Sequence, residues 1–437
     1  MLNKTNLVRF FFVFFIVLFS WASIFSGIDS YKLDNGLQVI LLDQDDKPEV
    51  SSIQVWYKVG SKDDPEDKTG MAHFCEHMMF RGSKQFPADK YSKNIGAWGG
   101  RLNAHTSYDK TVYHVDIASR YIPQILEMEA DRMYNLTLSA NVFEMERSVV
   151  LEERLWRVED QAIPFFVEQF NQKMFDDHPY AHPILGYEDH IKKISLADMK
   201  IFYKKFYVPH KTILIVVGNF SPKLVKRSIN HFFSDIPGKP ALPSMPAKQV
   251  IKNKKQFFKV YKQQQLPLWV TGFKVPNVYS TDFVALTFLN HLLFYGNFSL
   301  FQREIVDVYS EIVDSSGAYD GWRLGNSLFY IYAFPKDQKN VSFSEEKIYS
   351  FLKKIKRKGF DSKHIQAVKN KLKANYIFAL DSNAGLAKQI GTLALFNLPI
   401  NFYSQLMKKF SMMSNKELLR VYRKYINFNY RTTGYLL

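Results

Sequence analysis

Disulfide bonds within the chain are excluded by composition, because Cys75 is the single cysteine among 437 residues. A lone cysteine also does not identify the redox compartment in which a protein works. If the surrounding residues form a helix, Cys75 points about 200° away from His73. This direction favours a packed side chain over a metal ligand, and thiol-sensitive activity is the alternative.

Long clusters of basic residues are missing too, although the chain as a whole is basic. It has 58 lysines and arginines against 42 aspartates and glutamates and a formal net charge of +16, and its basic stretches, such as 252–255, are short. Nucleic-acid-binding surfaces usually concentrate Lys and Arg with aromatic residues between them, so this class is disfavoured. Scattered lysines predict solvated faces. They leave open a preference for acidic peptides or a weak association with membranes.

An apolar run of full transmembrane length is also missing. The longest run, from Phe10 to about Phe25, is slightly short for a membrane span and follows a basic head. A basic head and an apolar core are typical of a secretory signal. We therefore expect residues 1–26 to be a signal peptide that sends the chain to the periplasm, with a membrane anchor facing the periplasm as the alternative.

The most informative stretch that is present is His73-Phe74-Cys75-Glu76-His77. Two histidines four residues apart lie on the same side of a helix, one turn above each other. Glu76 is close enough to reach a water bound to a metal between them. This H-x-x-E-H arrangement reverses the H-E-x-x-H zinc motif of metalloproteases. A chance match has a probability on the order of one per cent, so the motif requires a third ligand to support it.

A candidate third ligand lies downstream, in the glutamate-rich stretch 144–154. Hydrolytic zinc usually takes three protein ligands and leaves a fourth position for water. Glu146 and Glu153 are seven residues apart, which places them on one face of a helix, two turns from each other. A solvated, charged helix is the alternative, and it is the more common reason for such a pattern.

A family resemblance decides between these alternatives. The segments HFCEHMMFRG, NAHTSYDKTVYH, EADRM, ERSVVLEER and HPYAHPILGYEDHI occur in this order between about Tyr31 and Phe220. They resemble the pitrilysin/insulinase (M16) family of zinc metalloendopeptidases, in the half-length type of the processing-peptidase subunits. The resemblance implies a Zn²⁺ cofactor and a catalytic general base, with an outer carboxylate beside the site. By motif position the zinc ligands are His73, His77 and Glu153, the base is Glu76, and the outer carboxylate is Glu146.

The resemblance also implies how a peptide substrate is held. In the family an Asn-Ala pair lies on an edge strand that pairs with the peptide, and here the pair is Asn103 and Ala104. Active members use an Arg and a Tyr seven residues apart, from the companion domain. The nearest pair here, Arg303 and Tyr309, is six apart. Half-length members form a clam-shell from two chains, so the partner is a second copy or a different M16-like chain.

The chain also shows signs of duplication on either side of a proline-rich stretch at 237–246. Helices with the capping pattern S-x-x-[DE] are expected to start at Ser195 and Ser414, which are 219 residues apart (195 to 414), and a strand-like stretch follows each. We predict an α+β fold of two homologous α/β-sandwich-like domains, each a mostly antiparallel sheet packed with helices. The expected divisions are a catalytic domain at 27–236, a linker at 237–248 and a second domain at 249–437.

The leading hypothesis is a zinc-dependent endopeptidase that cuts unfolded peptides or small proteins. The second copy of the metal helix, 285–293, retains only His291, so we expect no zinc in the second domain. One alternative is a catalytically weak or inactive partner subunit that kept the motif. Another is a structural zinc protein, but structural sites usually have four protein ligands and no nearby base.

Overall fold

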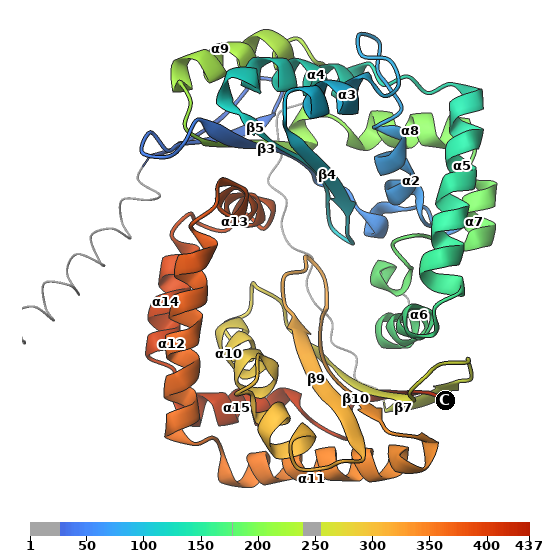
Figure 1. Cartoon of the computed structure of the whole chain (residues 1–437), viewed down its shortest axis with the longest axis vertical. Helices are drawn as coiled ribbons and strands as arrows, with labels where there is room; N and C mark the ends of the chain where they lie inside the picture. Colours follow the sequence, from blue (N-terminus) through green and yellow to red (C-terminus); the bar gives the residue numbers. More distant parts are fainter. Residues whose placement is uncertain (1–26, 177, 239–254) are drawn as a thin grey trace, which may run out of the picture.

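The computed structural model describes residues 27–176, 178–238 and 255–437, and it contains two sheets, each covered by helices (Figure 1). The α+β fold with two duplicated domains is confirmed. The predicted signal segment, 1–26, and most of the predicted linker, 239–248, lie outside the described residues. In the described part of the chain, no helix is both long and apolar enough to cross a membrane.

The first sheet has six strands in the order β1-β2-β6-β3-β5-β4, antiparallel throughout except where β2 meets β6. Its strands are β1 (Ile28–Lys32), β2 (Gln38–Asp43), β3 (Val50–Tyr57), β4 (Arg101–Thr106), β5 (Thr111–Ala118) and β6 (Thr212–Gly218). The central strand β6 is buried along its whole length, in keeping with its run of Ile, Leu and Val. Strand β4 ends the order and is therefore an edge strand.

The second sheet has five strands in the order β7-β11-β8-β10-β9. They are β7 (Gln256–Val260), β8 (Leu268–Val275), β9 (Ile312–Asp320), β10 (Ser327–Pro335) and β11 (Thr432–Leu436). This order repeats that of β2-β6-β3-β5-β4, including the parallel pair formed by β7 and β11. The repeated topology is the structural evidence for duplication.

Helices cover the outer faces of both sheets and their ends. The first part of the chain contributes α2 (Met71–Met78), α3 (Lys90–Ala97), α4 (Ile122–Tyr134), α5 (Ala140–Arg154), α6 (Ala162–Phe175), α7 (Glu188–Lys193), α8 (Leu196–Phe206) and α9 (Pro222–Phe233). The second contributes α10 (Phe283–Phe294), α11 (Val341–Lys358), α12 (Ser362–Ala379), α13 (Asn383–Leu395), α14 (Phe402–Ser411) and α15 (Asn415–Tyr425). Two π-helical segments follow α5 and α10, η3 (Leu155–Glu159) and η6 (Gln302–Val306). Short 3₁₀ turns lie at η1 (Ser61–Asp63), η2 (Ser119–Tyr121), η4 (Pro179–Ala181), η5 (Pro209–Lys211) and η7 (Gln338–Asn340).

The capping pattern found in the sequence begins the expected helices. The Ser195 hydroxyl accepts from the backbone N–H of Asp198 at the start of α8, and the Asp198 carboxylate accepts from the Ser195 N–H in return. The Ser414 hydroxyl accepts from the N–H of Glu417 at the start of α15. Each helix is followed by a central strand of its sheet, β6 or β11.

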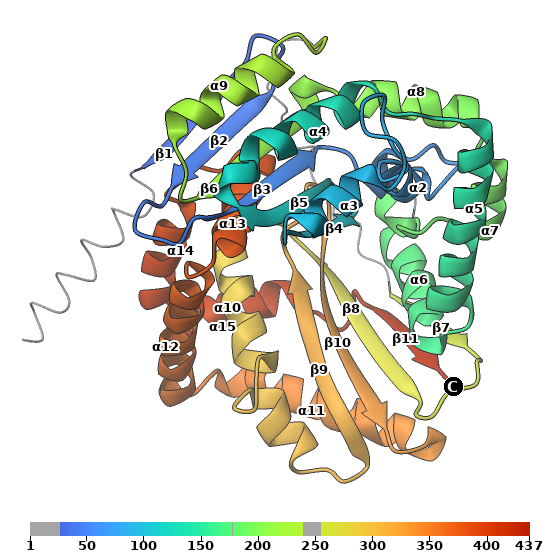
Figure 2. The same cartoon turned by 45° about the horizontal axis from the view of Figure 1, so that its top comes forward.

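The two halves are joined by an exchange of helices. Helix α13 of the second half packs beneath β3 and β6 of the first sheet, and α6 of the first half packs on β8 and β11 of the second (Figures 1 and 2). Gly391 on α13 lies so close to the Trp56 ring of β3 that a Cβ atom there would overlap it. The core beneath the first sheet is therefore built from both halves, which hold the two sheets in one body.

Candidate metal centre

Helix α2, which carries the H-x-x-E-H motif, is held at its first turn by a buried carboxylate. The oxygens of Asp64 accept from the backbone N–H groups of Gly70 at 2.7 Å and Ala72 at 2.8 Å. Gly70 has φ of 90°, and a Cβ atom there would lie 2.6 Å from the carbonyl oxygen of Leu185. The loop containing Gly186 therefore packs directly against the start of α2. The HPILGYED segment thus has a structural role, because only glycine fits at this close approach.

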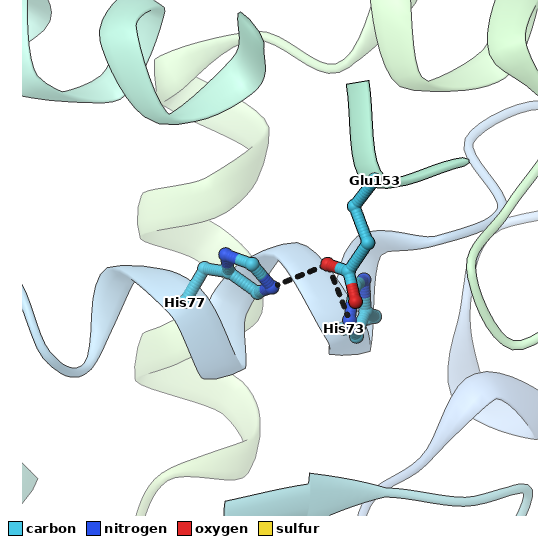
Figure 3. A group of neighbouring side chains, drawn as sticks. All are labelled: His73, His77 and Glu153. Atoms are coloured by element: carbon cyan, nitrogen blue, oxygen red, sulfur yellow. Dashed lines mark ion pairs between the residues drawn. The ribbon is translucent and has the colours of Figure 1, made fainter. Parts of the chain in front are cut away.

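Three potential metal ligands converge between α2 and α5 (Figure 3). Glu153 reaches from α5 toward both histidines of α2. Its Oε2 lies 3.1 Å from Nε2 of His77 and 3.6 Å from Nε2 of His73. The ligand atoms all lie within 4.8 Å of one another. Among the residues that the structure describes, this is the single group of histidine, cysteine and carboxylate side chains with such spacing.

The donor set fits zinc of the hydrolytic kind. Two imidazole nitrogens and one carboxylate oxygen are ligands that zinc prefers, and three protein ligands leave one position for water. Cys75 points away from them and is fully buried, so it does not contribute a fourth ligand. In the second half, His291 of α10 packs against the Tyr295 ring at a centroid distance of 4.8 Å.

Further side chains orient these donors. Nδ1 of His77 lies 2.8 Å from Oε1 of Glu146, and the other oxygen of Glu146 pairs with Arg81. Arg157, one turn after Glu153, holds the second oxygen of that carboxylate at 3.0 Å. Contacts of this type fix the orientation of a metal-binding histidine and raise its basicity.

The two histidines have opposite pKa shifts. Burial, together with the charge of His77, lowers the pKa of His73 to about 4, so its ring is neutral at pH 7. Burial also acts to lower the pKa of His77, but hydrogen bonds to Glu146 and Glu153 outweigh it and raise the pKa to about 9. A metal at this site would therefore have to displace a proton from His77.

Glu76 is fixed by a contact with the edge strand β4. Its Oε2 accepts a 2.5 Å hydrogen bond from the hydroxyl of Thr106. Burial raises the pKa of Glu76, and the Thr106 hydrogen bond opposes that rise. A raised pKa makes the ionised carboxylate a stronger proton acceptor, which suits Glu76 to general-base work.

The structure places the expected substrate-binding residues in different surroundings. Asn103 and Ala104 lie on the edge strand β4, and the Asn103 side chain accepts from the Ala104 N–H at 2.9 Å. Arg303, in η6, lies 2.5 Å from Nε2 of His364, and Tyr309 packs edge-on against Phe343. Both contacts are within the second half, and neither residue is brought to the metal ligands.

Several residues at this site were missed by sequence reasoning. Arg157 follows Glu153 by four residues, a helical ion-pair spacing that could have been found. Asp64 in a polar loop before α2 is a recognisable helix-start signal. Thr106 and Arg81 gave no such signal, because their partners lie 30 and 65 residues away in sequence.

Comparisons with known proteins agree with this description. The family model for insulinase (peptidase family M16) matches residues 39–188, and that for the peptidase M16 inactive domain matches residues 193–372. The zinc protease PqqE of Helicobacter pylori is 30% identical over 412 residues, or 93% of this chain and 92% of that protein. The crystal structure of a protease from Helicobacter pylori has a TM-score of 0.88 at 28% identity, covering 94% of this chain and 99% of that one. The periplasmic protease PqqL of Escherichia coli shares the fold, with a TM-score of 0.78 at 19% identity, over 94% of this chain and 48% of that one.

The duplicated α+β fold and the cluster of two histidines and a glutamate between α2 and α5 place the protein in the class of metallopeptidase folds. The chain belongs to the M16 (insulinase) peptidase family. The family resemblance seen in the sequence is therefore confirmed, and relatives named as zinc proteases make zinc the metal that the family indicates.

Proposed function

We propose that this protein is a zinc-dependent endopeptidase that hydrolyses peptide bonds in unfolded peptides or small proteins. One observation carries the proposal. His73, His77 and Glu153 converge from two helices, and Glu76 of the same motif is held beside them by the edge strand. A structural zinc site would not need a base at that position.

His73, His77 and Glu153 would hold the metal, and Glu146 would keep the His77 ring in place. When bound, zinc supplies Lewis acidity, which lowers the pKa of an attacking water and polarises the scissile carbonyl. Glu146 is only 2% exposed, so its contact with His77 is shielded from solvent. That shielding makes the orienting hydrogen bond stronger than it would be at the surface.

Glu76 carries the proton transfers in this mechanism. Its carboxylate takes a proton from water as the water oxygen bonds to the carbonyl carbon. It then delivers that proton to the amide nitrogen as the C–N bond breaks, which yields a free carboxyl group and a free amine. Thr106 keeps Oε2 of Glu76 in a fixed position, which leaves Oε1 to exchange the proton.

Strand β4 would bind the substrate as an additional strand of the first sheet. Its outer edge has no strand beside it in the described part of the chain. Main-chain hydrogen bonds to Asn103 and Ala104 would align an extended peptide without demanding much of its sequence. A folded protein offers few free strands for such pairing, so unfolded chains are the expected substrates.

We further propose that the chain works as part of a two-chain assembly. It spans about half of the Escherichia coli PqqL chain, whose fold it shares. Arg303 and Tyr309 engage residues of their own half, so a substrate-binding Arg/Tyr pair would have to come from a second copy or another M16-like chain. This departure also favours a second candidate function, a weakly active partner subunit.

Export to the periplasm rests on the basic head and apolar run of residues 1–26.

Cleavage of an unstructured peptide library tests the proposed function directly. We expect zinc-loaded wild type to cut, and we expect wild type with a chelator and Glu76→Gln to fail. Glu76→Gln should keep its zinc, whereas Glu153→Gln should lose it. Glu152→Gln is the matched control, because Glu152 is the exposed neighbour about 100° around the same helix. Zinc binding without cleavage would favour the partner-subunit function, and full activity in Glu76→Gln would overturn the mechanism.

A further inference from the structure

A cavity of about 410 Å³ lies between the two halves, on the side of the first sheet opposite α2. The turn between β4 and β5 forms one wall, through Ser107 and Lys110, and helix α13 forms another, through Lys388. Trp322 and Phe396 line the apolar part. The lining therefore combines apolar side chains with two cationic ones.

Among the described residues neither lysine of this cavity forms an ion pair; Lys110 is half-buried and Lys388 is exposed. The ammonium group of Lys110 lies 4.0 Å from the centre of the Trp56 ring, a contact that only partly replaces an anion. Burial, reinforced by the charge of Lys388, lowers the pKa of Lys110 to about 8. Lys110 is thus still mainly charged at pH 7, and Asp109 offsets that charge only in part, without an ion pair.

One carboxylate lines the cavity, but it is already engaged. The oxygens of Asp109 accept from the Tyr180 hydroxyl at 2.7 and 2.9 Å, and one accepts from the Leu324 N–H at 3.1 Å. These contacts tie the turn between β4 and β5 to the second half of the chain. Asp109 is therefore committed to these contacts and forms no ion pair with either lysine, which leaves room for an anion from outside.

The cavity lies on the side of the first sheet toward which alternate side chains of a bound peptide would point. Successive side chains of β4 face opposite sides of the sheet. Thr106 faces α2 and contacts Glu76, whereas His105 faces the other side, where Lys110 and Lys388 are among the charges that lower its pKa. A peptide added at the edge of β4 alternates in the same way, so every second side chain would face the same side of the sheet as His105. The one nearest the turn between β4 and β5 would lie closest to the two lysines.

We propose that this cavity is a subsite for an acidic side chain of the peptide substrate, a proposal that rests on the peptidase function. Its carboxylate would contact Lys110 and Lys388, and its methylene groups would pack against the aromatic wall. A charge-assisted contact in a partly buried site typically changes affinity by roughly 10-fold or more. Strand β4 by itself would contact only the peptide backbone. The basic cavity would therefore add a preference for an acidic side chain in the substrate.

Pairs of peptides that are identical except for Glu or Gln at one position test this subsite. The varied position is moved along the residues that flank one cleavage site. We expect wild type to favour Glu at one position by roughly 10-fold in kcat/KM. In Lys388→Gln and Lys110→Gln the Glu/Gln ratio should fall toward one. Lys200→Gln, an equal charge change at an exposed position on α8, should leave the ratio as in wild type. Equal rates for all Glu and Gln peptides in wild type, or a ratio that Lys388→Gln does not change, would overturn the subsite.

Fluorescence anisotropy measures how tightly the same peptides bind to the zinc-loaded Glu76→Gln variant. This measurement separates the subsite proposal from the peptidase proposal. Tighter binding of the Glu peptide that depends on Lys388 supports the subsite even if wild type cuts nothing, and only the peptidase function then fails. Cleavage with no preference between the peptides overturns the subsite alone. Titration with inorganic phosphate is the third arm. Lysine-dependent binding of phosphate with no preference for Glu peptides would identify a small-anion site and overturn the peptide subsite.

Discussion

The hydroxyl of Thr106 donates a 2.5 Å hydrogen bond to Oε2 of Glu76, and this contact links the edge strand β4 to the metal-site helix α2. The residue proposed to move the proton is thereby positioned by the strand proposed to hold the substrate. If a peptide binds along β4 as proposed, its binding and the placement of the base would be coupled through this one side chain.

Replacing Thr106 with valine should lower kcat/KM by roughly 10-fold, the effect of losing one hydrogen bond to a charged group. Zinc content, measured by mass spectrometry, should not change, because Thr106 is not a ligand. Thr106→Ser keeps the hydroxyl and should retain most of the activity. A fully active Thr106→Val enzyme would show that Glu76 needs no support from β4.

The Glu146→Gln substitution should weaken zinc binding by about 10- to 100-fold, since outer partners of a ligating histidine usually have effects of this size. The change removes the charge that holds both His77 and Arg81. Competition with a chelating dye measures the affinity. The control is Glu144→Gln on the same helix, where the carboxylate is exposed and pairs with Arg147. Equal zinc affinities for the two variants would contradict the orienting role.

Asp282, at the start of α10, should stabilise the second half in a pH-dependent manner. Burial acts to raise the pKa of Asp282, but hydrogen bonds from Arg420, Lys424 and Tyr425 outweigh it and lower the pKa to about 2. The folded pKa lies below the ordinary value of 3.8, so the ionised group stabilises the fold above about pH 4. This contribution is lost as the pH falls through about 2.

Urea unfolding at pH 7 should show Asp282→Asn to be less stable than wild type by about 1–2 kcal/mol, since Arg420 and Lys424 are half-exposed and partly screened by water. The difference should shrink as the pH is lowered toward 2. Asp381→Asn, a change at an exposed aspartate between α12 and α13, should leave stability unchanged. A pH-independent loss in Asp282→Asn would point to packing and not to charge.

The close approach of α13 to the first sheet predicts an unequal response to two glycine substitutions. Gly391→Ala places a methyl group against the Trp56 ring and should destabilise the protein by about 1–3 kcal/mol, as overpacking usually does. Gly96→Ala in α3 meets no atom within 4 Å and should be neutral or stabilising by up to about 1 kcal/mol. Thermal unfolding of both variants gives the comparison, and an equal loss in both would refute the tight fit.

Much of the fold followed from local patterns. The hairpin at Leu33–Leu37, the paired strands around 101–116 and the two capped helices 219 residues apart all depend on periodicity and turn chemistry within short windows. The apolar stretch 53–59 by itself predicts a strand with those bounds, whereas β3 begins and ends earlier, at Val50–Tyr57. Strand ends are set by the neighbours' hydrogen-bonding register, which a local pattern does not contain.

The sequence by itself determined the family and the helical spacing within each motif. His73 and His77 must lie one turn apart on any helix, and Glu146 and Glu153 two turns apart, because these are properties of the α-helix. Only the tertiary structure decided that α5 faces α2, that Thr106 contacts Glu76, and that Lys110 and Lys388 line one cavity. These contacts join segments that are distant in sequence, and they depend on which apolar faces pack together when both cores form.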